Sequence, residues 1–422
     1  MQGEEKKSFL KNIITLMSGS ALAQILTLLS MPILMKYFYD PEDYTNFTWF
    51  FNFVMLFVGI GGLRLETGIV LEKENRSARI LTSMSLRFML ISGLLGMLVA
   101  IGMSFFSENF KDFFGNPTLY ILVPTSIIIL GFIQILTSWF TREGSFSFLA
   151  GNKIYQSTAA VSGQLSFGAA KLTSIGLIIG RLIGSAVTAG LLVRRFFQSK
   201  EKPNNASRSE KVGLLKKHKK FIIFTTPATF IGIFINFLYI DLFRSYYGET
   251  LTGDISASYT LIGAGFALVS QSFAQVFYNK LAEMEDRDQI RKFYTYWLIR
   301  LTGVAAIIIT AVYLVPNSLV TFILGSKWAA LLPTMKVMCL WMGVMFISSS
   351  LSYIYIKMNR QDTTIYFDLV HTVVVYLSIH ISYTWYHDFT ISLWWYTITQ
   401  IAYYIVAVLA SYYFINKYQP LE

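Results

Sequence analysis

The stretch "GGLRLETGIVLEKENRSARI", residues 61–80, ends a long apolar run and places Arg64 and Glu66 before the apolar signal fades at Leu71. A charge at the centre of a bilayer is costly, at about 2.5–3.5 kcal/mol by insertion measurements. The surrounding chain is nonetheless strongly apolar, because 54% of its 422 residues are hydrophobic and only 14% are charged, against about 25% in soluble domains. Several apolar runs are long enough to cross a hydrocarbon core of about 30 Å, so the sequence predicts an integral membrane protein.

Twelve candidate spans follow from these runs. Backbone groups in hydrocarbon must be satisfied within their own segment, and long runs without alternation exclude a β-barrel. The expected fold class is therefore an all-α integral membrane protein with 12 transmembrane helices. The predicted spans cover residues 10–36, 45–71, 80–106, 118–141, 149–171, 174–195, 220–245, 255–277, 292–316, 329–355, 363–384 and 391–415.

The basic residues alternate between the loops that join the spans. With a cytoplasmic N-terminus, the inside loops hold 25 of the 35 Lys and Arg residues and the outside loops hold five. This positive-inside signal predicts that both termini are cytoplasmic. The inside loops also account for most of the net charge of +11, so the charge calls for no nucleic-acid partner.

The only long polar stretch, "KEKPNNASRSEKVGLLKKHKK" at 200–220, lies at the midpoint of the chain. It predicts a cytoplasmic basic linker, 199–219, that rests on an anionic leaflet between two six-helix lobes, 1–198 and 220–422. Six spans in each half make the halves parallel repeats, related by a pseudo-two-fold axis along the membrane normal. A substrate would then bind between the halves, near the midplane.

Motifs for catalysis or metal binding are scarce. The single cysteine, Cys339, excludes a disulfide framework and a cysteine-based metal site. Of the four histidines, only His387 stands beside a carboxylate, Asp388, and a solvated loop is the simpler interpretation. Neither a catalytic residue nor a metal site is predicted. The regular spacing of Gly176, Gly180 and Gly184 is interpreted as a helix-packing face.

Five Lys or Arg and three Asp or Glu side chains fall inside the predicted spans, away from their ends, where such groups usually face a bundle interior or a wet cavity. Two of them, Arg87 and Arg300, lie near enough to the inner interface to snorkel instead. The candidates for substrate binding are the basic ones, and Asp241 and Glu66 are the candidates for ion coupling. The full set is Arg64, Arg87, Arg181, Arg300 and Lys336, with the acids Glu66, Asp241 and Asp368.

Spacing along a helix predicts which of these charges meet. Arg64 and Glu66 are two positions apart, so on a continuous helix their side chains diverge by about 200° and no salt bridge is expected between them. Asp241 and Arg244 are three apart and share a face. They form either a structural pair near the outer surface, or Asp241 carries a coupling proton or sodium ion.

The excess of basic over acidic residues in the spans favours an anionic ligand. Arginine forms bidentate hydrogen bonds with phosphate, and these strengthen where the dielectric is low. The composition therefore favours a phosphate-bearing amphiphile over a cationic drug.

The N-terminal part of the chain resembles the start of bacterial lipid-linked oligosaccharide flippases, which are the O-antigen and capsular polysaccharide exporters of the multidrug/oligosaccharidyl-lipid/polysaccharide superfamily. The resemblance rests on Gln24, Pro32, "YDPEDY" (39–44) and "LRLETGIVL" (63–71), where Leu65 and Gly68 replace the aromatic residue and the alanine of the family pattern. In the second half, "LGSKWAALLPTMKVM" (324–338) and "YIYIKMNRQD" (353–362) are similar to the surroundings of the family's tenth span.

This resemblance implies two six-helix lobes that form a V around a central cavity. It implies movement of an undecaprenyl-diphosphate-linked oligosaccharide repeat from the inner to the outer leaflet of the bacterial inner membrane by alternating access. Coupling to an H+ or Na+ gradient is expected, without any other cofactor. The expected partners are that lipid-linked oligosaccharide, membrane lipids, a polysaccharide polymerase and a chain-length regulator, and the chain is expected to be a monomer.

Two rival classes fit the sequence less well. A membrane polysaccharide polymerase needs a sizeable outer loop with acids or a metal site, whereas the outer loops here have only about 3–13 residues. The chain is therefore not expected to be an enzyme. A multidrug/ion antiporter of the same superfamily should carry more acidic than basic residues in its cavity, which is the reverse of the pattern here.

Overall fold

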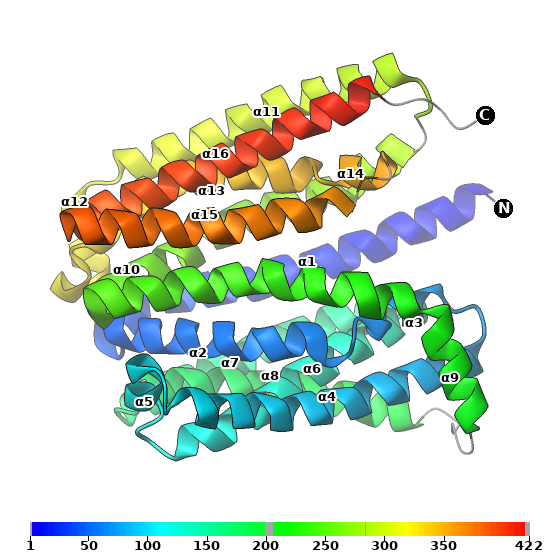
Figure 1. The fold of residues 1–422 in the computed structure, drawn as a ribbon, viewed down its shortest axis with the longest axis horizontal. Helices are drawn as coiled ribbons and strands as arrows, with labels where there is room; N and C mark the ends of the chain where they lie inside the picture. The colour runs from blue at the N-terminus through cyan, green and yellow to red at the C-terminus, as the bar shows by residue number, and fades with distance from the viewer. Residues whose placement is uncertain (1, 199–205, 283, 359, 361, 418–422) are drawn as a thin grey trace. The chain divides into compact units, whose positions relative to one another are not determined.

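Helices make up all of the regular secondary structure in the part of the chain that the computed structural model describes, which is residues 2–198, 206–282, 284–358, 360 and 362–417. The predicted all-α fold is therefore confirmed for these residues. The helices are α1 (Gln2–Tyr37), α2 (Pro41–Gly61), α3 (Leu65–Leu71), α4 (Asn75–Met103), α5 (Glu108–Phe113), α6 (Thr118–Arg142), α7 (Phe146–Ala169), α8 (Thr173–Gln198), α9 (Arg208–Lys217), a π-helical turn (Phe221–Thr225), α10 (Thr226–Ala282), α11 (Arg287–Leu314), α12 (Asn317–Leu324), a 3-10 turn (Ser326–Trp328), α13 (Leu331–Leu351), α14 (Tyr353–Lys357), α15 (Asp362–Tyr386) and α16 (Phe389–Asn416), as labelled in Figure 1.

Packing contacts divide the chain into two compact units. Unit 1 comprises Met1–Tyr39 and Asn46–Phe237, and unit 2 comprises Asp40–Thr45 and Leu238–Glu422. The division falls inside α10, because the first part of this helix packs with unit 1, where Phe237 lies 5.7 Å from the ring of Trp49. The predicted lobes, 1–198 and 220–422, are defined by the position of the polar linker in the sequence. The two units are defined instead by packing contacts between residues.

The number of spans depends on how α7 and α10 are counted. Nine helices of the described chain are long and apolar enough to cross a membrane, or ten if the bent pair of α2 and α3 forms one span. The apolar part of α10, Phe221–Phe266, has 46 residues, far more than the about 20 that a bilayer requires. Gly248 breaks this helix with φ 81° and ψ 177°. The nine helices and the bent pair of α2 and α3 give ten spans. Counting α10 as two spans and adding α7, which is not among the nine, raises this number to the twelve that were predicted.

Glycines allow close helix packing in unit 1. A Cβ on Gly180 would lie 2.5 Å from the backbone nitrogen of Gln164, and a Cβ on Gly163 would lie 3.0 Å from Gly180 Cα. A Cβ on Gly176 would lie 2.8 Å from the hydroxyl of Tyr39. These approaches confirm that the glycine stripe of α8 is a helix-packing face, turned mainly toward α7.

The core of unit 2 is built around α13, whose ring of Trp341 lies 5.8 Å from that of Tyr396 on α16. The short segment Asp40–Thr45 belongs to this unit because it contacts the region after the Gly248 break. Thr45 donates to the carbonyl of Glu249 at 2.5 Å, and the ring of Tyr44 lies edge-on to Trp328 at 5.3 Å.

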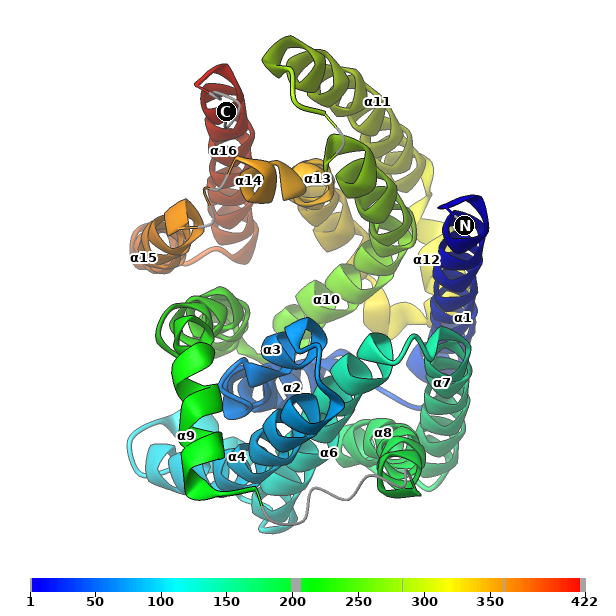
Figure 2. The same ribbon diagram turned by 90° about the vertical axis from the view of Figure 1, so that its right-hand side faces the viewer.

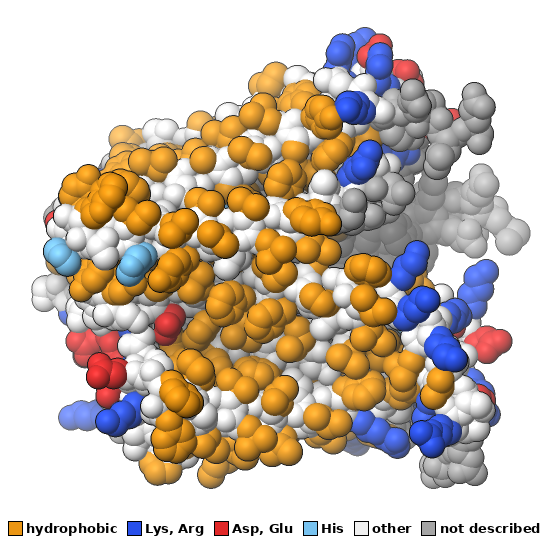
Figure 3. All heavy atoms as spheres, viewed as in Figure 1, with side chains coloured by type: hydrophobic (Ala, Val, Ile, Leu, Met, Phe, Trp, Pro, Cys, Tyr) orange, Lys and Arg blue, Asp and Glu red, His pale blue; other side chains and the backbone are white. Residues whose placement is uncertain are grey.

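The surface of each unit shows the chemistry of a multi-pass membrane protein. On the face drawn in Figure 3, hydrophobic side chains cover the lengths of the helices, and most of the Lys and Arg side chains lie toward one helix end. In unit 1 this end carries α3, α9 and the start of α4 (Figure 2). The assignment of that end to the cytoplasm stays a prediction.

Candidate functional site

The candidate site in unit 1 begins with a sharp bend between α2 and α3. The two helices differ in direction by 50°. Leu63 and Arg64, which join them, have φ values of 52° and 54°. A side chain other than glycine in this left-handed region costs about 1–3 kcal/mol, so the surrounding structure must hold it in place. Strain of this kind is concentrated at functional sites, which makes the bend a candidate.

Buried apolar side chains and backbone hydrogen bonds hold the bend. Leu65 and Ile69 on α3 are completely buried. The backbone nitrogen of Leu63 donates to the carbonyl of Ile60 at 2.8 Å, and that of Leu65 donates to the carbonyl of Gly62 at 3.1 Å. The backbone groups that the helix break would otherwise leave unpaired are therefore partly satisfied within the turn.

Arg64 and Glu66 form an ion pair at this bend, with 3.2 Å between Arg64 Nη1 and Glu66 Oε1. The same carboxylate oxygen accepts a hydrogen bond from Gln134 Nε2 on α6 at 2.8 Å. The expectation that Arg64 and Glu66 form no salt bridge is therefore wrong. It assumed a continuous helix, whereas the left-handed backbone at Leu63 and Arg64 brings the two side chains together.

The ion pair leaves hydrogen-bonding capacity unused. Glu66 Oε2 and Arg64 Nε are buried and have no hydrogen-bond partner among the described residues. The side chain of Glu66 is 4% exposed and that of Arg64 is 28% exposed. A Cβ on Gly62 would lie 2.7 Å from Glu66 Oε2, so a glycine admits the carboxylate against the backbone. Arg64 is thus a partly exposed guanidinium with more N–H donors than the single acid beside it can accept, an arrangement that suits an anion.

The far end of α3 is held by a second charge cluster. The carboxylate of Glu72 lies 2.7 Å from Lys217 Nζ and 2.6 Å from His218 Nε2. Burial raises the pKa of Glu72, but hydrogen bonds and charges from Lys217 and His218 outweigh it, so the pKa lies below its usual value. A Cβ on Gly68 would lie 2.8 Å from His218 Nδ1, and the glycine therefore makes room for the imidazole.

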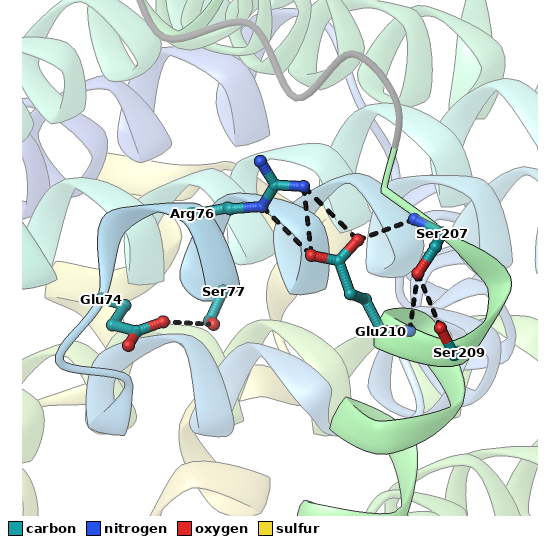
Figure 4. Close-up of polar contacts among 6 residues, drawn as sticks. All are labelled: Glu74, Arg76, Ser77, Ser207, Ser209 and Glu210. Atoms are coloured by element: carbon teal, nitrogen blue, oxygen red, sulfur yellow. Dashed lines mark hydrogen bonds and ion pairs between the residues drawn. The ribbon is translucent and has the colours of Figure 1, made fainter.

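Two helices connect to this end of α3. Arg142 at the end of α6 donates from Nε to the carbonyl of Glu72 at 2.8 Å. On α9, Glu210 pairs with Arg76 of α4 at 3.1 Å, and its carboxylate also accepts a hydrogen bond from the backbone nitrogen of Ser207 at 2.7 Å (Figure 4). The predicted linker, where described, is thus a docked helix with a capping box at its start.

The other predicted residues of unit 1 lie apart from the bend. Arg87 is exposed on α4. The guanidinium of Arg181 on α8 lies over the rings of Phe51 at 4.4 Å and Phe47 at 5.5 Å.

The predicted residues of unit 2 are likewise distributed over several helices. Arg300 on α11 lies 4.1 Å from the ring of Tyr296, and Lys336 on α13 lies 5.9 Å from the ring of Tyr313. Asp241 is half-buried on α10. Arg244, its predicted alternative partner, pairs with Glu249 at 2.5 Å across the Gly248 break.

Sequence reasoning missed Gln134, the residue that fixes Glu66. Only ionisable side chains were considered as candidates inside the spans, and a neutral amide was passed over. The sequence does contain a signal for this residue, because Gln134 places an amide within the aliphatic run "IIILGFIQIL", residues 127–136. A buried amide needs a polar partner, so its presence there predicts a second polar group on a neighbouring helix.

Comparison with known proteins shows the family to which the chain belongs. The sequence profile of the family described as "Polysaccharide biosynthesis protein" matches residues 34–333, which is more than half of the chain. The chain belongs to this family. The predicted family is confirmed, while no curated protein matches the chain at a significant level.

Solved structures show the fold of this family member. The lipid II flippase MurJ in an inward closed conformation matches with a TM-score of 0.68 and 13% identity, over 94% of this chain and 87% of that one. An inward-facing multidrug resistance MATE family transporter of the MOP superfamily matches with a TM-score of 0.66 and 13% identity, over 96% and 94%. A MOP superfamily transporter from Pyrococcus furiosus, described as having a binding pocket of reverse polarity, matches with a TM-score of 0.64 and 11% identity, over 97% of both chains. At these identities the likeness shows the fold alone.

Proposed function

We propose that this protein moves an undecaprenyl-diphosphate-linked oligosaccharide repeat from the inner to the outer leaflet of the bacterial inner membrane. Movement would follow alternating access around a central cavity, driven by an H+ or Na+ gradient. The observation that carries the proposal is Arg64, a partly exposed guanidinium at the strained end of a membrane span. Such a group suits a diphosphate headgroup as it leaves water, since arginine binds phosphate through parallel N–H donors.

The arginines resting on aromatic rings support an anionic substrate. Arg181 and Arg300 contact rings with the face of the guanidinium and have no carboxylate partner among the described residues. A cation–π contact uses the face of the group, and its N–H donors lie in the plane and stay available. Both side chains are exposed within their own units. Their N–H donors are therefore suited to bind a phosphate or a sugar hydroxyl of the substrate as it moves along a transport path.

A multidrug/ion antiporter is the second candidate, favoured by the buried acid Glu66 and the half-buried acid Asp241. A cationic drug would need these carboxylates to be accessible. Glu66, however, is 4% exposed and its Oε1 already contacts Arg64 and Gln134.

Replacement of Arg64 tests the proposal. Arg64→Ala should lower surface polysaccharide at least tenfold in a deletion strain complemented with the gene, because about 1.4 kcal/mol of lost phosphate binding corresponds to a factor of ten. Arg64→Lys should be intermediate, since lysine keeps the charge and loses the bidentate geometry. Polysaccharide would be quantified beside an immunoblot of the membrane fraction.

Arg76→Ala is the matched control, because Arg76 pairs with Glu210 at the same helix end without lying at the bend. Its polysaccharide level should stay close to that of the wild type. Wild-type polysaccharide with Arg64→Ala would remove Arg64 from the substrate path. In proteoliposomes, transport of ethidium instead of a fluorescent undecaprenyl-diphosphate-linked saccharide would establish the antiporter.

Asp241 tests the energy coupling. Asp241→Asn should lose the gradient dependence of flipping in the same vesicles, because the amide cannot exchange a proton or balance a sodium ion. Initial rates would be compared with and without an imposed pH or Na+ gradient. Full gradient dependence in the variant would show that Asp241 is structural.

A further inference from the structure

Unit 2 carries a cluster of titratable side chains that the proposed substrate path does not use. Three of the four histidines of the chain lie on α15 or directly after it: His371, His380 and His387. His371 is 5% exposed and follows Asp368 by three positions, so the two side chains share one face of the helix. An acid and a histidine inside a membrane span are costly to keep, and such groups mark proton relays in many transporters.

The cluster is completed by two residues of α16. Tyr403 donates a hydrogen bond to Asp368 Oδ1 at 2.9 Å. Its ring also stacks on the imidazole of His371, with 3.7 Å between the ring centres and 7° between the planes. On its other side His371 is bonded through Nε2 to Gln400 Oε1 at 2.9 Å. Tyr403 therefore touches both the acid and the base, and the group is physically continuous.

The position of the cluster allows exchange with water at one end of the helix. Helix α15 begins at Asp362, so Asp368 and His371 lie six and nine residues from its start. At 1.5 Å per residue these positions are about 9 and 14 Å along the helix. Asp368 is half-buried, whereas His371 and Gln400 are buried. A proton would thus reach Asp368 first and His371 behind it.

Other titratable groups face the cluster from the elements around it. Tyr404 of α16 lies edge-on to His371, with 6.4 Å between ring centres and 70° between planes. Tyr355 on α14 donates a hydrogen bond to the carbonyl of Ala407, one turn beyond Tyr403 on α16, and Tyr259 on α10 lies close to Tyr404. All three are neutral phenols at physiological pH. The charge of the cluster is therefore decided by Asp368 and His371.

We infer that Asp368, His371 and Tyr403 form a proton-binding site that couples transport to the pH gradient, and that it acts together with the coupling residue proposed at Asp241. One proton from the aqueous phase binds the Asp368 carboxylate or the His371 imidazole and changes the net charge of the pair from −1 to 0. Tyr403 links the two positions by its hydrogen bond and its ring contact. The same proton leaves when the site opens to the other aqueous phase, so no oxidant or further reactant is required. Use of this proton for lipid export rests on the proposed function, whereas its binding does not.

The competing explanation is that these contacts merely hold α15 to α16, as interhelical hydrogen bonds do in many membrane proteins. Asp368→Asn separates the two explanations. The Asn carbonyl still accepts the hydrogen bond from Tyr403, so a purely structural contact survives, but the group can no longer take up a proton. We therefore expect unchanged thermal unfolding in detergent together with loss of proton uptake.

Proton uptake can be measured without any lipid substrate. Purified protein in proteoliposomes on a solid-supported membrane would be given pH jumps at constant Na+, and the displaced charge would be recorded. Wild type should show a transient charge movement that Asp368→Asn loses. Tyr403→Phe keeps the ring contact with His371 and loses the hydrogen bond to Asp368, so it should shift the pH at which the charge movement is half complete. His380→Gln, on the same helix and bonded to Tyr246 instead, is the matched control and should behave as the wild type.

Wild-type charge movement in Asp368→Asn, or a movement triggered by Na+ jumps at constant pH, would overturn the inference. Should Asp368→Asn fail to fold, an unshifted midpoint in Tyr403→Phe would overturn it. The proposed function fails separately, if wild-type protein shows the pH-driven movement but flips no undecaprenyl-diphosphate-linked saccharide. Flipping that needs a pH gradient in Asp368→Asn would leave the proposed function standing and remove this site.

Discussion

At Leu63 and Arg64 the backbone enters the left-handed region twice in succession, at a cost of about 1–3 kcal/mol for each residue. Both residues carry side chains, so this conformation is maintained by their surroundings. The buried Leu65 anchors the start of α3, and Glu66 binds both Arg64 and Gln134. A single residue without a side chain, Gly62, provides the space in which the carboxylate sits. The position of the candidate phosphate-binding guanidinium thus depends on a few local contacts.

Gly62→Ala tests this dependence. The added Cβ would lie 2.7 Å from Glu66 Oε2, so the carboxylate must shift and the ion pair with Arg64 must loosen. We expect a loss of about 1–3 kcal/mol in unfolding free energy, as for other overpacked sites, seen as a lower unfolding temperature in detergent. Gly151→Ala on α7 is the control, because nothing lies within 4 Å of its added Cβ and alanine favours a helix by about 1 kcal/mol. Equal unfolding temperatures for the two variants would contradict this account.

At the scale of elements, α3 is a short helix held at both ends by its neighbours. Its start is bound to α6 through Gln134, and its end is bound to α6 through Arg142 and to α9 through Glu72. The seven residues of α3 are too few to form a stable helix alone, since isolated helices shorter than about 12–15 residues are marginal in water. The bend and the docked linker helix are therefore mechanically connected through α3.

Acid should release α9 from this position. The folded-state pKa of Glu72 lies below its ordinary value near 4.5, so its contribution is complete above about pH 4.5 and is lost as the pH falls through the lowered pKa. Hydrogen–deuterium exchange of residues 208–217, corrected for the chemical rate at each pH, should rise only below that range. Glu72→Gln should raise exchange at neutral pH, because about 1–3 kcal/mol is lost when a charged hydrogen-bond partner is removed.

Glu74→Gln provides the comparison for that experiment. Glu74 lies two residues away and accepts a hydrogen bond from Ser77 on its own helix (Figure 4). Its removal should leave the exchange of α9 unchanged. Increased exchange in Glu74→Gln as large as in Glu72→Gln would show that general charge, and not the Glu72 contacts, holds the linker helix.

At the scale of the whole molecule, the path of the chain depends on the long helix α10. Its 57 residues would extend about 85 Å if they were straight, nearly three times the hydrocarbon core of a bilayer. The break at Gly248 divides this helix into two segments, and the twelve-span topology requires each of them to cross the membrane. One span in place of two would invert every loop that follows.

The accessibility of introduced cysteines distinguishes one membrane crossing by α10 from two. In a Cys339→Ala background, Gly213→Cys before α10 and Glu285→Cys after it should react with an impermeant maleimide from the same side of the membrane. The two positions end on the same side only if α10 crosses twice. Labelling from opposite sides would exclude the twelve-span topology. Gly115→Cys after α5 serves as the control, and it should be labelled from the opposite side to Gly213→Cys.

Much of the fold was predictable because hydrophobicity is a property of whole segments. Long apolar runs, positive loops and the glycine spacing of α8 each require only composition and periodicity, and the helices and the glycine contacts agree with them. The family likewise followed from local patterns near the bend, and the profile match over residues 34–333 confirms it. Arg64 stood out for the same reason, as a charge within an apolar run.

The partners of Arg64 were not predictable in this way. A rule for a continuous helix placed Glu66 on another face, and two left-handed residues made that rule fail. Gln134 is 68 residues away from Glu66 and Tyr403 is 35 residues away from Asp368, so no local spacing joins them.

The sequence by itself determined that this chain is helical, crosses a membrane and carries basic groups within its spans, because transfer free energy depends on each segment alone. Only the tertiary structure decided which charges meet, where the second span bends, and that an acid, a tyrosine and a histidine form one buried cluster. These features depend on contacts between helices distant in sequence, and such contacts exist only once the chain has packed.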